Sequence, residues 1–160
     1  MKKPSGYIIY EGKSQLNGGN IVAIVTMSSK NIKTGNMASM WILNADIPPT
    51  KASKQGEDAS VCGDCKHRAV NNGACYVTLH HAPLQVYKSY KRGNYPIAND
   101  MAIFEDMKVR FGAYGDPSAI PTQILASIKA VVKNNTSYTH QWKQGNKILK
   151  QVSMASVDSI

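Results

Sequence analysis

The segment Met107-Lys108-Val109-Arg110-Phe111-Gly112-Ala113-Tyr114-Gly115-Asp116-Pro117 predicts a strand over residues 107–111 that runs into a sharp turn over Gly112–Pro117. A helix is predicted next, because Pro121 is typical of a helix start. Apolar residues then recur at helical spacing and form one stripe: Ile124, Leu125, Ile128, Val131 and Val132. The order strand, turn, helix is typical of an α/β protein.

The chain after this helix predicts two more short strands. Asn134-Asn135 ends the helix, and Ser137–His140 is a short strand candidate. Gln144–Lys150 is a weak helix candidate because it contains Gly145, and Val152–Val157 predicts a closing strand. Strand–helix–strand order implies right-handed crossovers and a parallel sheet, and three or four parallel strands are expected when a strand further upstream is counted.

The chain before residue 45 is predicted to be β-rich. Tyr7–Tyr10 is a short strand candidate, and Asn17–Asn20 has the composition of a turn. Ile21–Met27 is almost wholly apolar and β-branched, which predicts a buried strand. Asn31–Gly35 predicts a second turn, so the strand predicted over Met37–Leu43 should run antiparallel to the one before it.

The expected fold is therefore an α/β protein in which an N-terminal β-hairpin is followed by a partial parallel βα sheet, incomplete and barrel-like. Residues 1–160 are expected to form a single domain, since the chain has 160 residues. Within it we distinguish a β-rich start (1–45), a Cys/His loop (58–82) and βα units (83–160). Thr50–Asp58 is predicted to hold one helical turn, and a helix is predicted from Pro83 until Gly93 stops it.

The net charge of +9 suggests a polyanionic partner such as nucleic acid, or else only a well-solvated surface. The basic residues are scattered and form no dense run, so charge alone leaves both interpretations open. The apolar run at residues 21–27 is far too short to span a bilayer, and no signal peptide is recognised. We therefore expect a soluble cytoplasmic protein without membrane contact, in the host cell cytoplasm if a phage encodes it.

All three cysteines fall in one stretch with the pattern Cys62-x2-Cys65-x-His67-x7-Cys75. Cysteines in a reducing cytosol favour metal binding over disulfides, and an odd number agrees with this. Cys62, Cys65, His67 and Cys75 are therefore predicted metal ligands, with His80 and His81 as spare candidates. Three thiolates and one imidazole suit Zn²⁺, whereas three cysteines with an open iron corner suit a four-iron cluster, and the spacing does not separate the two.

Ligands of parallel α/β folds bind at the carboxyl ends of strands, which selects the turn at Gly112–Pro117, the segment from His140, and Ser156 with Asp158. In the first, Asp116 either accepts hydrogen bonds from a ligand or caps a helix. Arg110 either points into a polar cavity, pairs with a carboxylate such as Asp116, or lies on a surface edge strand. His140 is a candidate for proton transfer, although a histidine beside Trp142 also suits a structural role.

An ordered set of motifs resembles an uncharacterised protein family common in bacteriophage genomes. The motifs follow one another along most of the chain beyond residue 20: Lys33-Thr34-Gly35, Trp41-Ile42-Leu43, Cys62-Gly63-Asp64-Cys65-Lys66-His67-Arg68, Cys75-Tyr76-Val77, Arg110-x-Gly112-x-Tyr114-Gly115-Asp116-Pro117, Tyr138-Thr139-His140-Gln141-Trp142 and Met154-Ala155-Ser156-Val157-Asp158. The family has no activity to carry over, so this resemblance implies a phage-type protein and nothing about its chemistry.

A weaker resemblance is to radical S-adenosylmethionine enzymes, which place a three-cysteine cluster loop before a glycine-rich acidic turn in a partial barrel. The order is the same here, but the spacing is Cys-x2-Cys-x9-Cys instead of the usual Cys-x3-Cys-x2-Cys. The resemblance implies an iron–sulfur cluster and S-adenosylmethionine, held by a turn that includes Gly112, Tyr114, Gly115 and Asp116. It further implies that Arg110 and His140 face the substrate, or else that the chain is a degenerate, non-catalytic relative.

Two functions are thus expected. The first is a metal- or iron–sulfur-binding protein of phage type, resembling a radical S-adenosylmethionine enzyme or a degenerate relative of one. The alternative is a non-catalytic protein whose loop is stapled by Zn²⁺ and whose basic surface binds nucleic acid or a host protein. The identity of the fourth metal ligand separates them, because catalytic sites keep a vacant position.

Overall fold

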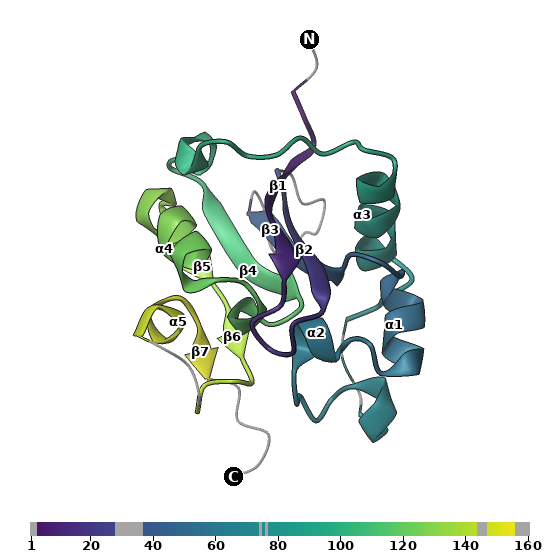
Figure 1. Cartoon of the computed structure of the whole chain (residues 1–160). Helices are drawn as coiled ribbons and strands as arrows, with labels where there is room; N and C mark the ends of the chain where they lie inside the picture. The colour runs from purple at the N-terminus through teal and green to yellow at the C-terminus, as the bar shows by residue number, and fades with distance from the viewer. Residues whose placement is uncertain (1–2, 28–36, 74, 76, 144–146, 156–160) are drawn as a thin grey trace.

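The computed structural model describes residues 3–27, 37–73, 75, 77–143 and 147–155 (Figure 1). The turn predicted at Asn31–Gly35 therefore lies outside the described residues, as do Gly145, Ser156 and Asp158. The motif Lys33-Thr34-Gly35, Tyr76 and the segment from Ser156 onward also lie outside them.

The centre of the molecule is a five-stranded sheet with the strand order β1-β2-β3-β4-β5. Its strands are β1 (Gly6–Lys13), β2 (Asn20–Thr26), β3 (Ala38–Asn44), β4 (Lys108–Tyr114) and β5 (Asn134–Thr136). The first three pair antiparallel, and β3–β4 and β4–β5 pair parallel. The predicted α/β class, with an antiparallel hairpin followed by parallel strands, is confirmed.

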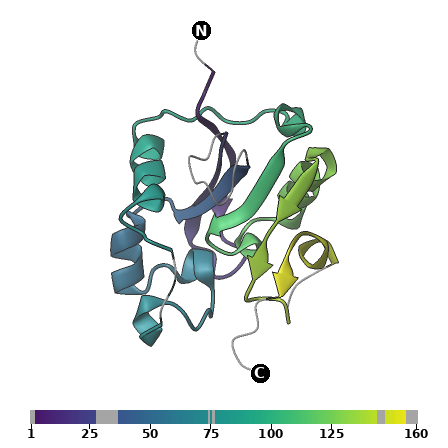
Figure 2. The same ribbon diagram turned by 180° about the vertical axis from the view of Figure 1, so that it is seen from behind.

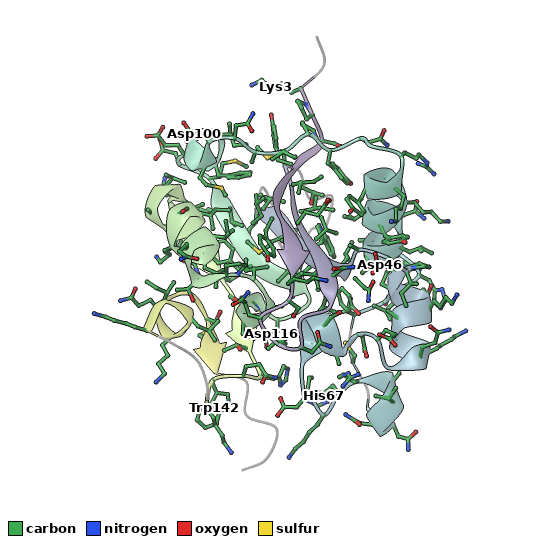
Figure 3. The ribbon with its side chains drawn as sticks, viewed as in Figure 1. Lys3, Asp46, His67, Asp100, Asp116 and Trp142 are labelled. Atoms are coloured by element: carbon green, nitrogen blue, oxygen red, sulfur yellow. The ribbon has the colours of Figure 1, made fainter. Side chains whose placement is uncertain are left out.

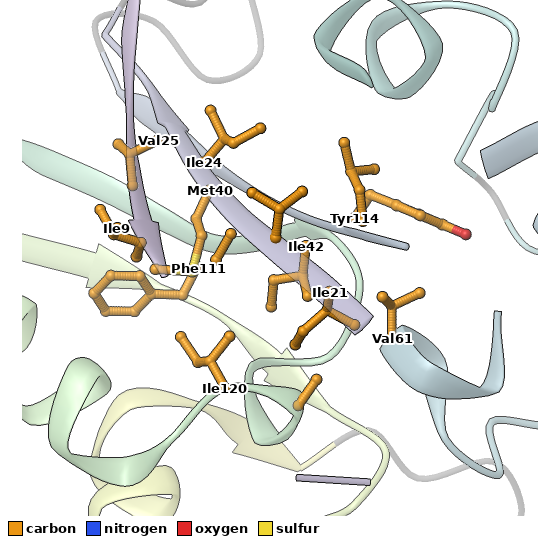
Figure 4. Close-up of a cluster of buried hydrophobic side chains, with 14 of the residues drawn as sticks. Ile9, Ile21, Ile24, Val25, Met40, Ile42, Val61, Phe111, Tyr114 and Ile120 are labelled. Atoms are coloured by element: carbon orange, nitrogen blue, oxygen red, sulfur yellow. The ribbon is translucent and has the colours of Figure 1, made fainter. Parts of the chain in front are cut away.

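The β2 strand forms the middle of the core because both faces of the sheet are covered there. Residues Ile21 to Val25 are completely buried, which is why this strand is apolar throughout and does not alternate. Figure 4 shows Ile21, Ile24 and Val25 of this strand with Met40 and Ile42 of β3 and Phe111 of β4. Val61 joins the same cluster from the cysteine-containing part of the chain.

Helices occupy the connections of the parallel half. The segment between β3 and β4 holds α1 (Pro49–Gln55), α2 (Ala59–Cys62), η1 (Ala69–Asn71), α3 (Ala82–Lys91) and η2 (Met101–Phe104), and the segment between β4 and β5 holds η3 (Pro117–Ala119) and α4 (Thr122–Val131). Figures 1 and 2 show α1 and α3 on one side of the sheet's strands and α4 with the later α5 (Lys147–Val152) on the other. The predicted helices from Pro83 and Pro121 are confirmed, each within one residue of its expected start.

The β4 strand is longer than predicted, because it continues through Gly112 to Tyr114. Gly112 has a φ of 70°, which only glycine adopts at little cost, and the chain bulges there instead of turning away. The register to β3 shows the bulge: Arg110 lies opposite Ser39, but the next paired residue is Tyr114, opposite Trp41.

The last strands differ from the prediction. Asn134-Asn135 forms β5 in the main sheet, whereas the sequence predicted only a helix end there. The predicted strands near 138 and 154 exist as β6 (Tyr138–Thr139) and β7 (Met154–Ala155), but they pair parallel with each other in a separate two-stranded sheet. The physical reason is that the chain leaves β5 after Thr136, so the later strands do not extend the ladder.

Among the described residues, no helix is both long enough and apolar enough to cross a bilayer.

Candidate functional site

A cavity of about 390 Å³ lies at the carboxyl ends of the parallel strands. Its walls come from three parts of the chain that are far apart in sequence. They are the cysteine loop with Cys62, Cys65, Cys75 and Val77, the stretch from Arg110 to Asp116, and the segment after β5 with Thr136, Ser137, Tyr138 and His140. The cavity is therefore where the rule for parallel sheets places a ligand site.

The cysteines reach this cavity from the long connection between β3 and β4. Cys62 is the last residue of α2, Cys65 follows in the next turn, and Cys75 lies ahead of α3. Cys62 and Cys65 are partly buried, and Cys75 is exposed. As arranged here, the described residues contain no group of three or more His, Cys, Asp or Glu side chains placed to hold a metal ion.

The cysteine loop is fixed to the helices before it by Arg68. The guanidinium donates to the Asp58 carboxylate at 2.7 and 3.0 Å, and to the carbonyls of Gly56 and Gly63 at 2.9 Å each. Both members of this ion pair are largely buried, with 12% and 4% of their side chains exposed. Burial lowers the pKa of Arg68, but the hydrogen bond and charge of Asp58 outweigh it and raise the pKa overall.

A second contact ties the loop to the segment after β6. The Gln141 amide donates to the Asp64 carboxylate. Gly63 leaves the space for this, since a Cβ there would lie 2.7 Å from the Gln141 amide nitrogen. The rings of His67 and His140 meet edge to face with their centroids 5.6 Å apart. The cysteine loop and the Tyr138–Trp142 segment thus form adjoining walls of the cavity.

The bulge of β4 brings the glycine-rich turn against β3. Gly115 has a φ of 85°, and a Cβ on it would lie 2.7 Å from both the Cβ and the carbonyl oxygen of Ile42. This close approach requires glycine. It also turns Tyr114, 4% exposed, toward the cysteine loop, where its side chain hydrogen-bonds with Cys62.

The environment of Cys62 favours the protonated thiol. Burial raises its pKa well above the usual range, and the charges of Asp58, Cys65 and Cys75 raise it further, while the hydrogen bond from Tyr114 works in the opposite direction. Burial likewise raises the pKa of Tyr114, with Cys62 the next cause. A cation placed among these groups would reverse the effect on the thiol.

Asp116 is buried and fully engaged with the protein. One carboxylate oxygen accepts hydrogen bonds from the Ser118 backbone and hydroxyl at 3.0 and 2.8 Å and from the Thr139 hydroxyl at 2.8 Å. The other accepts from the His140 backbone at 2.8 Å. Of the two roles open from the sequence, the structure displays the capping one, at η3, and adds a tie to β6. A ligand contact by Asp116 stays a prediction.

Several predicted residues are brought together, and three candidate ligands are set apart. Arg110, Gly112, Tyr114, Gly115, Asp116 and His140 all line the cavity with the three cysteines. His67, which packs against His140, and the spare candidates His80 and His81 are not among the lining residues. Arg68 and Gln141 were not predicted as anchors of the loop. No local pattern marks them, because their partners Asp58 and Asp64 lie 10 and 77 residues away.

Comparisons of the chain with protein-family models, with curated proteins and with solved structures found no match. The case for a function therefore rests on the cavity and its residues.

Proposed function

We propose that this protein binds a metal ion or an iron–sulfur cluster through Cys62, Cys65 and Cys75, beside a cavity that accepts a small ligand or part of a larger one. The observation that carries the proposal is that all three cysteines of the chain line one cavity, together with the bulged turn of β4. Thiols scattered in a loop without a function would have no reason to share the wall of a ligand-sized cavity.

The donor chemistry suits such a group. Thiolates bind Zn²⁺ and the irons of iron–sulfur clusters, and the raised pKa of Cys62 means that binding must displace a proton. A bound cluster would supply electron transfer, and a bound Zn²⁺ would supply a Lewis acid or a structural link. Arg68 and Tyr114 position the loop and the Cys62 sulfur.

The contacts of the loop favour a role in chemistry over a role as a staple. Arg68 already fixes the loop to Gly56 and Asp58, and Gln141 fixes it to the β6 segment. A loop held from both sides by protein contacts does not need a metal for its shape. The proposal therefore places the metal group at the cavity for what it does to a ligand there.

A more specific form of this proposal is a phage-type protein that resembles radical S-adenosylmethionine enzymes. In it, Gly112, Tyr114 and Gly115 contact the cofactor. Asp116 then acts as a positioning residue, since its carboxylate is occupied by Ser118, Thr139 and His140. Arg110 and His140 then face the substrate from two different walls of the cavity that both line. The rival is a Zn²⁺-stapled protein without activity.

The test is metal analysis and an absorption spectrum of protein purified without oxygen. About four irons per chain and a brown colour are expected for a cluster. One zinc and a colourless protein would remove the cluster and the radical chemistry. Protein without a bound metal, after loading with either zinc or iron and sulfide, would refute the proposal as a whole.

The four histidines give matched variants for the fourth ligand. His67→Ala should lower the metal content if His67 is the fourth ligand, as the sequence pattern predicts. His140→Ala should lower it if the fourth ligand comes from the cavity wall instead. His80→Ala and His81→Ala are controls, since both residues are exposed and outside the cavity. Equal metal content in all four variants would indicate a cluster with an open corner, whereas loss in a control would contradict the site.

A further inference from the structure

The charged residues are distributed unevenly along the chain. From Pro117 to Val157 there are five lysines and no aspartate or glutamate. Four of the lysines are exposed, and three of these lie in the segments next to the small second sheet. They are Lys143, which follows β6, and Lys147 and Lys150, which lie one turn apart on α5.

Exposed aromatic and apolar side chains accompany these lysines. Tyr138 and Met154 face each other across the β6–β7 pair, with 58% and 54% of their surfaces exposed. Trp142 is half-buried, and the Lys143 ammonium lies 5.5 Å from the centre of its ring. Figure 3 labels Trp142 at the lower end of the molecule, near β7. We call Tyr138, Trp142, Lys143, Lys147 and Lys150 the β6–α5 face.

This face opens onto the cavity. Tyr138 belongs to both, because it is largely exposed and also lines the cavity with Cys62 and Cys75. A ligand lying on the face would therefore pass the cavity entrance. Asp64, the acidic residue that reaches this side from the cysteine loop, is hydrogen-bonded to Gln141.

We propose that the β6–α5 face binds a single-stranded polynucleotide and presents one of its nucleotides to the cysteine-lined cavity. Bases stack on exposed aromatic rings, and lysines neutralise the phosphates between them. A duplex keeps its bases stacked on one another, so they cannot stack on the aromatic side chains of the protein. The binding itself does not depend on a metal, but the nucleotide's fate in the cavity rests on the proposed function.

The first measurement is the anisotropy of a labelled, unstructured oligonucleotide in increasing KCl. Lys143→Gln with Lys147→Gln and Lys150→Gln should weaken binding and reduce the slope of log affinity against log salt by about two. The matched control carries Lys51→Gln, Lys54→Gln and Lys88→Gln, which removes the same charge from exposed lysines of α1 and α3. If the two triple variants lose the same affinity, the face is not the binding surface.

The second measurement tests stacking. Tyr138→Ala should weaken oligonucleotide binding by about 5- to 150-fold. Ile97→Ala is the control, because Ile97 is 68% exposed and lies outside the face. In a Trp41→Phe background Trp142 is the single tryptophan, and its fluorescence should be quenched by the oligonucleotide. Wild-type affinity in Tyr138→Ala together with unquenched Trp142 would overturn the proposal.

Competition identifies the partner. The competitors are compared at the same total charge. The unlabelled single strand should displace the probe, whereas neither the duplex of the same sequence nor polyglutamate should displace it. Equal competition by polyglutamate would point to an acidic protein and refute the proposal, and equal competition by the duplex would refute stacking. Protein treated with a chelator to remove bound metal should bind the oligonucleotide as untreated protein does, so a failed metal site and a failed binding face are distinguishable.

Discussion

The antiparallel and the parallel halves of the main sheet are built differently. In the antiparallel half β2 lies between β1 and β3, is apolar and buried, and pairs with β3 without interruption from Ile21 to Thr26. Its pairing with β1 shifts register once, between Ile8 and Tyr10. In the parallel half the register of β3 and β4 breaks after Arg110, and Gly112 and Gly115 take positive φ angles. The cavity borders this second half alone.

The difference shows how one sheet provides both stability and a site. In the antiparallel half the side chains of β2 from Ile21 to Val25 are completely buried and fill the space on both faces of the sheet. A bulge gives up ladder hydrogen bonds but re-aims the side chains beside it. Here the bulge directs Tyr114 toward Cys62 and borders the cavity that the cysteines line. Substitutions in the two halves should therefore have separable effects.

The largest effect is expected in the antiparallel half. Ile24→Ala should lower the free energy of unfolding by about 4 kcal/mol, because Ile24 is completely buried and the rigid sheet cannot close the space. Chemical denaturation measures this, with Ile24→Val as a control that should cost about 1 kcal/mol. The folded fraction should keep the wild-type metal content. A loss of metal without a loss of stability would contradict the separation of the halves.

A smaller loss of stability, but a large change at the cavity, is expected for Arg68→Ala. Removing one member of a buried ion pair leaves Asp58 unpaired, which should cost about 3 kcal/mol. The loop also loses its link to Gly63, so a thiol reagent should react faster with Cys62. Arg92→Ala removes an exposed arginine of the α3 end and should change neither quantity. Unaltered thiol reactivity in Arg68→Ala would show that the loop is held by other contacts.

The smallest of the three effects is expected for Gly115→Ala, at about 2 kcal/mol. The new Cβ would collide with Ile42 and also force a φ of 85° on alanine. Gly18→Ala separates these causes, because Gly18 has a φ of 75° but open space around it, and it should cost less. If both variants cost the same, the close approach of β4 to β3 does not matter, and the proposed origin of the cavity is wrong.

The comparison also explains which features the sequence could predict. The β2 strand and the helix starts at Pro83 and Pro121 were predictable because their signals are local: continuous apolar residues, and proline at a first turn. The end of β4 was not, because Gly112 is typical of a turn, and only the pairing with β3 makes it a bulge. Asn134-Asn135 has no β propensity, and β5 forms because β4 offers a free edge.

The candidate site was predictable in its position and only partly in its members. Strand order alone placed the cysteines, the Gly112–Pro117 turn, His140 and Ser156 with Asp158 on one rim. The cysteines, the residues from Gly112 to Asp116 and His140 line the cavity, whereas Ser156 and Asp158 lie outside the described residues. The anchoring by Arg68 and Gln141 depends on contacts between distant segments, which no spacing in the sequence encodes. Metal binding itself stays a prediction until metal content is measured.

All three cysteines lie in the connection that carries the chain from the end of β3 back to the start of β4. Any parallel pair needs such a return path, but the sheet restricts only its two ends. Residues can thus be gained or lost between the donors without shifting the register of either strand. In evolution, the number and spacing of the cysteines would be free to change while the sheet remained the same, so the proposed metal site could be altered without disturbing the fold.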